Sequence, residues 1–272
     1  MRRSLPPARA LLLAFTTVLA FSARAETLRV RADHWMPYNG SPDAELPGYA
    51  IELARAIFEP NGITVEYATM PWGDALKAAA AGEIEAVIGA NRDEAEGLIL
   101  PQECVGLPRI GLFVRKENPW RYQNVASLFS VKLGVVLDYK YWSALDDYIA
   151  KSGEPRVFQL SGEQPLEDAL AQLDAGKLDV VAETAAVFSW TMKSAGYPSG
   201  SFRTVYLHEG DPVYFAFTPR DGAGKRFAEI FDRGLRDLRR SGQLSRILAR
   251  YGLGDWEQVA VATKSTGVAR AD

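Results

Sequence analysis

The 272-residue sequence has little of the chemistry that marks a metalloprotein or a disulfide-stabilised domain. Its single cysteine, Cys104, cannot form an intramolecular disulfide and excludes a cysteine-rich zinc site. The only two histidines, His34 and His208, are too far apart along the chain to suggest a histidine-rich metal centre. We therefore expect neither a metal nor a cofactor, and a fold that depends on its hydrophobic core.

A strong positive charge is absent as well. With 31 lysines and arginines against 34 acidic residues, the formal charge of −3 gives no electrostatic reason to expect nucleic-acid binding. We find no phosphate-binding loop, no Gly-x-Ser-x-Gly nucleophile motif and no evident Ser/His/Asp arrangement. The composition, 47% hydrophobic and 24% charged, is that of a globular α/β protein. The sequence thus favours a binding protein over an enzyme.

The first 25 residues have the three parts of a secretory signal. Arg2, Arg3 and Arg9 precede a largely apolar run over residues 10–21, and small residues then occupy the two positions that a signal peptidase reads. The run is shorter than the roughly 20 residues of a membrane-spanning helix. We predict cleavage after Ala25 and export to the periplasm, which changes the formal charge to −7 because four arginines and no acid are removed.

Hydrophobic periodicity then alternates between the strand and the helix patterns. Residues 84–88 are almost all apolar, as in strands of parallel sheets that helices cover on both faces. The predicted strands are 28–32, 63–67, 84–88, 110–114, 133–136, 178–182 and 213–217. The predicted helices are 49–59, 72–81, 142–151, 166–175, 185–194, 224–240 and 243–250.

One local pattern occurs twice. The segment 81–87, Ala-Gly-Glu-Ile-Glu-Ala-Val, is followed 94 residues later by the segment 175–181, Ala-Gly-Lys-Leu-Asp-Val-Val. In both, a helix is expected to end at glycine, which adopts the left-handed conformation without a side-chain clash, and an apolar strand follows. A chance recurrence of a common helix-to-strand connection stays open, but the flanking order of strand, helix and strand repeats too, which favours two similar α/β lobes.

We expect lobe 1 to comprise residues 26–108 and 219–258, and lobe 2 to comprise residues 109–218. The chain then crosses twice between the lobes, and these two crossings form a hinge. Residues 259–272 are expected to be a flexible tail.

Several motifs, in this order, resemble those of the extracytoplasmic solute-binding proteins of family 3, the polar amino-acid type. They are Trp35-x-Pro37-Tyr38, the segment 48–53, Pro71-Trp72, the segments 82–87 and 176–181, and a closing pattern from Leu238 to Gly252. The resemblance covers nearly the whole chain after residue 25. It implies a type II, two-lobed periplasmic binding fold, a small polar ligand in the interlobe cleft, a monomer, and an inner-membrane ABC permease as partner.

Carried over one position at a time, the resemblance implies a set of ligand-binding residues. In lobe 1, Trp35 corresponds to the aromatic residue that stacks on the ligand, Tyr38 belongs to the same loop, and Trp72 supplies a second wall. In lobe 2, Glu183 and Thr184 lie near the position at which the family has the acid that binds the ligand's amine. The alternative for either tryptophan is a place in the core.

Other positions depart from the family pattern. After the strand 84–88, Ala90 and Asn91 take the place of small or hydroxyl residues, and the position of the arginine that grips the ligand carboxylate is Gly97. Arg92 could replace that arginine, or be a surface residue paired with a neighbouring acid. In lobe 2, Tyr139 and Lys140 replace a turn of small residues, which predicts a bulkier and more charged cleft.

Three functions stay open at this point. The leading one is a periplasmic receptor for an amino acid or a related amine. The related amine is included because the missing arginine makes an ordinary α-amino acid a poorer fit. An exported cyclohexadienyl dehydratase shares the expected fold, and a ligand-sensing subunit of a membrane signalling protein would have the same cleft.

Overall fold

The computed structural model describes residues 26–162 and 164–258. The expected signal peptide and the expected flexible tail lie outside these residues. The strands are β1 (Glu26–Ala32), β2 (Ile63–Thr69), β3 (Ala86–Ala90), β4 (Arg109–Arg115), β5 (Leu133–Val136), β6 (Val157–Leu160), β7 (Val180–Thr184), β8 (Phe202–Glu209) and β9 (Tyr214–Phe217). The α-helices are α1 (Tyr49–Phe58), α2 (Trp72–Ala81), α3 (Ser143–Lys151), α4 (Pro165–Asp174), α5 (Ala185–Ser194), α6 (Ala223–Arg240) and α7 (Gln243–Arg250). Short 3₁₀ turns occur at Glu59–Asn61, Val125–Ser130 and Arg220–Gly222.

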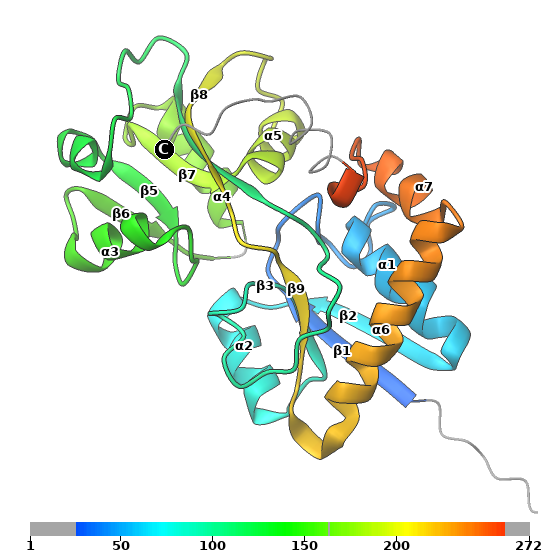
Figure 1. Cartoon of the computed structure of the whole chain (residues 1–272). Coiled ribbons are helices and arrows are strands. Elements are labelled where there is room, and N and C mark those ends of the chain that lie inside the picture. The colour runs from blue at the N-terminus through cyan, green and yellow to red at the C-terminus, as the bar shows by residue number, and fades with distance from the viewer. Residues whose placement is uncertain (1–25, 163, 259–272) are drawn as a thin grey trace, which may run out of the picture.

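The strands form two sheets, one in each of two lobes (Figure 1). The sheet of lobe 1 is four-stranded in the order β2-β1-β3-β9, with β2, β1 and β3 parallel and β9 antiparallel. Helix α6 packs against α1 and β9, and α2 packs against β1 and β3. Helices therefore cover this sheet, which explains why β3 is almost entirely buried.

The sheet of lobe 2 is five-stranded in the order β6-β5-β7-β4-β8. Strands β6, β5 and β7 are parallel, and β4 pairs antiparallel with both β7 and β8. The two lobes thus share one pattern, three parallel strands followed by an antiparallel strand, to which lobe 2 adds β8. The prediction of two similar α/β lobes is confirmed.

The repeated segments occupy equivalent places in this pattern. Gly82 and Gly176 follow α2 and α4 with φ of 74° and 70°, so both positions need the left-handed conformation that glycine adopts without strain. The strand that follows is β3 in one lobe and β7 in the other. Both begin two residues later than predicted.

The two connections between the lobes lie side by side. Residues 91–108 lead from β3 to β4, and residues 210–213 lead back from β8 to β9. The backbones of Val105 and Gly106 exchange hydrogen bonds of 2.8 and 3.1 Å with Val213, and Gly210 N donates to Pro108 O at 2.9 Å. This pair of segments, seen between the lobes in Figure 1, is a hinge with two crossings.

One predicted assignment is wrong. The strand 213–217 was expected in lobe 2, but β9 pairs with β3 in lobe 1, so the second crossing comes before this strand. The continuous apolar pattern of residues 213–217 predicts a buried strand. It does not show whether that strand pairs with the sheet of lobe 1 or with the sheet of lobe 2. Strands β6 and β8 were not predicted, because both are partly exposed edge strands without a continuous apolar run or a regular alternation.

Both lobes have continuous cores. In lobe 1, α1, β1, β9 and the apolar face of α6 bury Tyr49, Phe58, Phe217, Phe227 and Phe231 almost completely. The sheet of lobe 2 is covered on one face by a cluster around Leu112 and Leu133, and on the other by residues of α4 and α5. Within the described residues, no helix combines the length and hydrophobicity that crossing a membrane requires.

Candidate functional site

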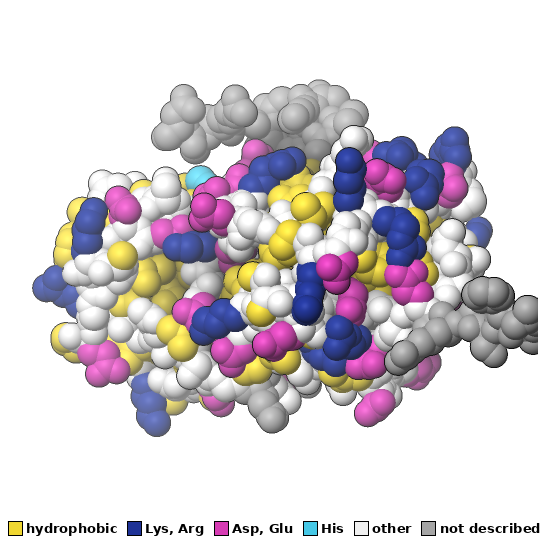
Figure 2. Space-filling view, turned by 90° about the horizontal axis from the view of Figure 1, so that it is seen from below, with side chains coloured by type: hydrophobic (Ala, Val, Ile, Leu, Met, Phe, Trp, Pro, Cys, Tyr) yellow, Lys and Arg dark blue, Asp and Glu magenta, His cyan; other side chains and the backbone are white. Residues whose placement is uncertain are grey.

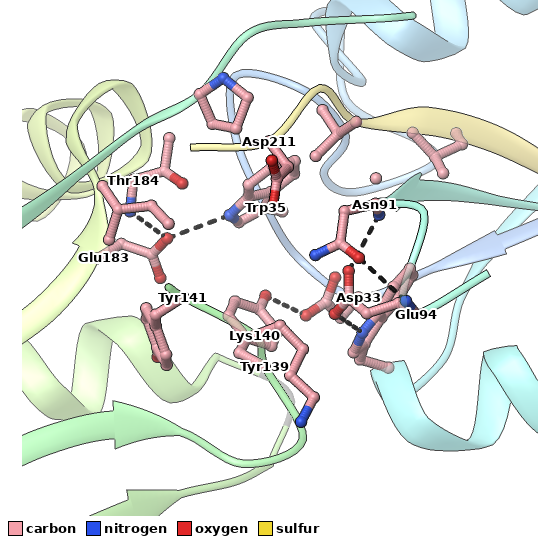
Figure 3. Close-up of a pocket in the computed structure, with 16 residues that line it drawn as sticks. Asp33, Trp35, Asn91, Glu94, Tyr139, Lys140, Tyr141, Glu183, Thr184 and Asp211 are labelled. Atoms are coloured by element: carbon pink, nitrogen blue, oxygen red, sulfur yellow. Dashed lines mark hydrogen bonds between the residues drawn. The ribbon is translucent and has the colours of Figure 1, made fainter. Parts of the chain in front are cut away.

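A cleft lies between the two lobes, where the carboxyl ends of their parallel strands face each other. It encloses an empty volume of about 560 Å³, which includes open solvent at its mouth. The residues after β1 and β3 form one wall, and the residues at the ends of β5 and β7 form the other (Figure 3). Loops at strand carboxyl ends are the usual place for ligands in α/β folds. The lining residues are Asp33, Trp35, Trp72, Ile88, Gly89, Asn91, Glu94, Pro108, Ile110, Tyr139, Lys140, Tyr141, Glu183, Thr184, Asp211 and Val213.

The structure brings seven of the ten predicted site residues together in this lining. They are Trp35, Trp72, Asn91, Tyr139, Lys140, Glu183 and Thr184. Tyr38 and Ala90 are placed in the core instead: Tyr38 is 5% exposed beneath Trp35, and Ala90 is fully buried behind the wall of lobe 1. Arg92 also lies outside the lining.

Trp35 connects the two walls. Its ring is stacked on Tyr38 with 4.0 Å between the ring centroids, and this packing fixes its position in lobe 1. Its Nε1 donates a hydrogen bond of 3.2 Å to Oε1 of Glu183 in lobe 2. One face of the indole is therefore held by the core while its polar edge reaches the opposite lobe.

Glu183 is the most deeply buried carboxyl group of the cleft, with only 2% of the residue exposed. It is the fourth residue of β7, and its Oε1 also accepts a hydrogen bond of 2.6 Å from the backbone N–H of Thr184. Burial raises the pKa of this carboxyl to about 7, although the hydrogen bonds from Thr184 and Trp35 favour the ionised form. Near neutral pH, Glu183 thus exchanges readily between its protonated and charged forms.

Asp33 forms the reciprocal contact from lobe 1. It follows β1 directly, and its Oδ2 accepts a hydrogen bond from the phenol of Tyr139 in lobe 2 (Figure 3). Burial raises the pKa of the Asp33 carboxyl to about 6, opposed by the hydrogen bond from Tyr139. Each lobe therefore places an aromatic hydrogen-bond donor on an acid of the other.

Glu94 lies on the same wall as Asp33 but is held within its own lobe. Its Oε1 accepts a hydrogen bond of 3.1 Å from Nε1 of Trp72, and its Oε2 accepts one of 3.1 Å from the backbone N–H of Asn91. The Asn91 side chain in turn accepts from the backbone N–H of Glu94 at 2.9 Å. Burial raises the pKa of Glu94 to about 7, the largest opposing effect being the bond from Asn91.

The charges around the cleft are unbalanced. Among the described residues, four carboxyl groups, those of Asp33, Glu94, Glu183 and Asp211, line it together with one cation, Lys140. Among residues 26–162 and 164–258, no ion pair includes any of the four. Lys140 is exposed at the edge of the cleft (Figure 3), and its positive charge favours the ionised form of Glu94 across from it.

Arg92 is bound elsewhere, which leaves the cleft lining without an arginine. Its guanidinium donates a hydrogen bond of 3.2 Å to the hydroxyl of Tyr214 and lies 5.2 Å from the centroid of the same ring. The alternative that Arg92 pairs with a neighbouring acid is not seen either among the described ion pairs. The described partner of the Arg92 guanidinium is therefore the aromatic residue Tyr214 of β9 and not a carboxylate.

Four polar lining residues were missed by sequence reasoning. Asp33 and Tyr141 could have been found, because each lies within a few residues of a predicted strand's carboxyl end, beside a residue that was selected. Glu94 lies three residues before Gly97, in a connection for which the sequence pattern predicts no element. Asp211 lies in the return crossing, and the misassignment of β9 concealed its place at the hinge.

The described residues also limit other interpretations of the cleft. No group of three or more His, Cys, Asp or Glu side chains in the described part of the chain could hold a metal ion, so the cleft acids do not converge on one point. On the face of the molecule seen in Figure 2, basic and acidic side chains are intermixed. Such a surface lacks the continuous basic field that nucleic-acid binding needs.

Comparison with solved structures gives the same fold at low sequence identity. A histidine kinase sensor domain with similarity to periplasmic binding proteins matches with a TM-score of 0.69 and 22% identity, over 84% of this chain and 96% of that one. An ancestral arginine-binding protein bound to arginine matches with a TM-score of 0.68 and 20% identity, over 83% of this chain and 97% of that one. The substrate-binding protein of an amino-acid ABC transporter matches with a TM-score of 0.66 and 15% identity, over 83% of this chain and 98% of that one.

At these identities the structural likeness shows the fold alone, and no curated protein sequence is similar enough to match the chain. The family model of the bacterial extracellular solute-binding proteins, family 3, matches residues 28–254, nearly all of the described chain. The motifs that carried the resemblance lie within that range, and two of their residues, Trp35 and Trp72, line the interlobe cleft. The chain belongs to the bacterial extracellular solute-binding proteins, family 3.

Proposed function

We propose that this protein captures a small, positively charged polar solute in the interlobe cleft and delivers it to an ABC permease of the inner membrane. The observation that supports this function is the composition of the cleft: aromatic walls on both lobes and carboxyl groups without ion-paired partners. Aromatic faces and carboxylates together bind ammonium or guanidinium groups. A solute that contacts both walls stabilises the closed arrangement of the lobes.

The proposed location is the periplasm, reached through cleavage after Ala25. Family membership supports an extracytoplasmic protein. We further propose that the protein acts as a monomer, since the cleft is completed by residues of a single chain.

A ligand-sensing subunit is the second candidate, favoured by the likeness to a histidine kinase sensor domain. Its cleft and closure would be the same, and only the docking partner differs. Co-purification with a permease from native membranes supports transport, whereas co-purification with a membrane kinase supports sensing.

An exported dehydratase acting on cyclohexadienyl acids fits the cleft poorly. Such substrates carry carboxylates, which need cationic partners, whereas this cleft presents four carboxyl groups and one exposed lysine. No release of phenylpyruvate from prephenate by the purified protein is the expected result.

The test is a thermal-shift screen of the mature protein against amino acids, amines and organic acids at neutral pH. A ligand that binds the folded state raises the melting temperature by mass action, by an amount that grows with ligand concentration. Small-angle scattering with the best ligand should then show a smaller radius of gyration as the lobes close. Failure of every class of compound to change either quantity would contradict the proposed function.

A further inference from the structure

We infer that the ligand is a linear organic dication without a carboxylate group, such as a diamine or an aminoalkylguanidine. This inference rests on the proposed function and specifies the ligand class of the same cleft. It departs from the amino acids that give this family type its name, and four features of the cleft carry it.

The first feature is the absence of a clamp for a carboxylate in the described lining. Gly97 stands at the position where the family resemblance places an arginine, and Arg92 is turned toward Tyr214. Lys140 is the one cation of the described lining; its charge favours the ionised form of Glu94, but its exposed ammonium group forms no ion pair with a described acid of the cleft. A ligand carboxylate in the cleft would therefore face Asp33, Glu94 and Glu183 without a guanidinium partner, and like charges at close range repel.

The second feature is the distribution of the acids over both walls. Asp33 and Glu94 belong to lobe 1 and Glu183 to lobe 2. A ligand with a cation at each end can contact a carboxyl group on each lobe, so both ends favour closure. A monoamine would leave one wall with an uncompensated buried acid, which is costly.

The third feature is the free oxygen on each of the two reciprocal acids. Glu183 uses Oε1 for both Trp35 and Thr184, and Asp33 uses Oδ2 for Tyr139. Among the described residues, no hydrogen bond from another loop or lobe reaches Oε2 of Glu183 or Oδ1 of Asp33; the other interactions of these carboxyl groups are local, with the Thr184 side chain and the Asp33 backbone. An ammonium group can therefore pair with either acid while the neutral aromatic donors stay in place.

The fourth feature separates an organic cation from a metal ion. The described acids do not form a group of three that could hold a metal, and the space between them is walled by Trp35, Trp72, Tyr139 and Tyr141. Aromatic rings pack on a methylene chain and attract ammonium and guanidinium groups through their faces. The cleft thus offers acids for the two ends of the ligand and rings for its middle.

Titration of the cleft supports the same class. Burial raises the pKa of Glu94 and Glu183 to about 7 and that of Asp33 to about 6. A cation bound beside them favours their ionised forms, so binding at neutral pH releases protons to the buffer. Neutral or anionic ligands would not have this effect.

The test uses two ligand pairs that differ by one carboxylate: agmatine with arginine, and cadaverine with lysine. Isothermal titration calorimetry of the mature protein at pH 7.5 should give at least tenfold tighter binding for the decarboxylated member of at least one pair. Titrations in buffers of different ionisation enthalpy should show proton release for that amine. Equal or tighter binding of the amino acids would overturn the inference and leave the proposed function intact, whereas failure of the whole compound screen would remove both.

Two variants locate the contacts. Glu183→Gln keeps the size and the acceptor for Trp35 but removes the charge, and should weaken amine binding at least tenfold; Asp33→Asn tests the other wall if that variant does not fold. The matched control, Asp147→Asn, removes an acid on the exposed face of α3 and should leave affinity unchanged. Lys140→Ala removes the one cation of the described lining and should tighten amine binding, because like charges repel. A loss of binding in Lys140→Ala, or unchanged affinity in folded Glu183→Gln and Asp33→Asn, would contradict the inference.

Discussion

The two walls of the cleft are built on equivalent strands but are stabilised differently. Trp35 follows the end of β1 by three residues, and Tyr139 follows the end of β5, its counterpart in lobe 2, by the same number. Each donates a hydrogen bond to an acid of the opposite lobe. The repeat of the fold has thus produced a reciprocal pair of contacts across the cleft.

The acids themselves show the difference. Glu94 of lobe 1 takes both of its hydrogen bonds from its own lobe, through Trp72 and Asn91. Glu183 of lobe 2 is more deeply buried and takes one of its two from Trp35 across the cleft. The environment of Glu94 therefore depends on lobe 1 alone, whereas the environments of Glu183 and Asp33 are completed only when the lobes meet.

Removing Trp35 should have the largest effect on this comparison. Trp35→Ala removes the ring that lines the cleft and the donor to Glu183, and we expect affinity for the tightest amine of the screen to fall more than tenfold. Calorimetry measures the change. Phe129→Ala, which removes an aromatic ring that is 53% exposed outside the cleft lining, is the control and should bind normally.

The second-largest effect is expected in the pH dependence of stability, which should reflect the burial of the cleft acids Asp33, Glu94 and Glu183. A carboxyl group whose pKa is raised on folding stabilises the protein fully at pH values below its pKa in the unfolded state. This contribution is lost as the pH rises through its pKa in the folded state. For Glu183, with a rise from 4.5 to about 7, the loss is on the order of 3 kcal/mol, and Asp33 and Glu94 act in the same direction.

The melting temperature of the empty protein should therefore fall between pH 5.5 and pH 8, by about 5 °C or more. The groups that face Glu183 are Trp35, Thr184, Asp33, Tyr139 and Tyr141, and none is cationic. Glu183→Gln should reduce the fall, and a saturating amine should reverse it. A melting temperature that is constant over this range would show that the acids are not desolvated.

A smaller effect is expected from the reciprocal hydrogen bond of lobe 2. Tyr139→Phe keeps the ring but removes the donor to Asp33, so the closed arrangement should become less populated in the absence of ligand. Scattering should show a larger radius of gyration and calorimetry a loss of affinity of roughly two- to fivefold. Tyr148→Phe removes a hydroxyl that donates to Leu128 O within lobe 2 and should change neither.

The smallest effect is expected for Arg92→Ala. Because the Arg92 guanidinium contacts Tyr214 and does not line the cleft, amine affinity should change less than twofold. A tenfold loss would instead assign Arg92 to the ligand and restore the carboxylate clamp that the family resemblance implies.

Much of the fold could be predicted from local patterns. The helices α2, α5 and α7 have the predicted bounds, and Gly82 and Gly176 end their helices as expected, since periodicity and helix termination depend on neighbouring residues. The edge strand β8 and the place of β9 could not be predicted, because strand pairing depends on which edges meet in space.

The site was only partly predictable for the same reason. Trp35, Tyr139 and Glu183 stand at strand ends and could be selected from the sequence, yet nothing in the sequence indicates that Nε1 of Trp35 reaches Glu183, 148 positions away. Arg92 was selected by its position beside a strand, but its orientation depends on Tyr214, a residue that comes from the other end of the chain.

By itself, the sequence determined the family, the two α/β lobes and the kinds of side chain available at the strand ends, because these follow from local residue order. Only the tertiary structure decided that the available acids and aromatic rings face one another while the arginine does not. The two crossings determine which strand ends oppose each other, and burial in that narrow space then raises the pKa of Asp33, Glu94 and Glu183.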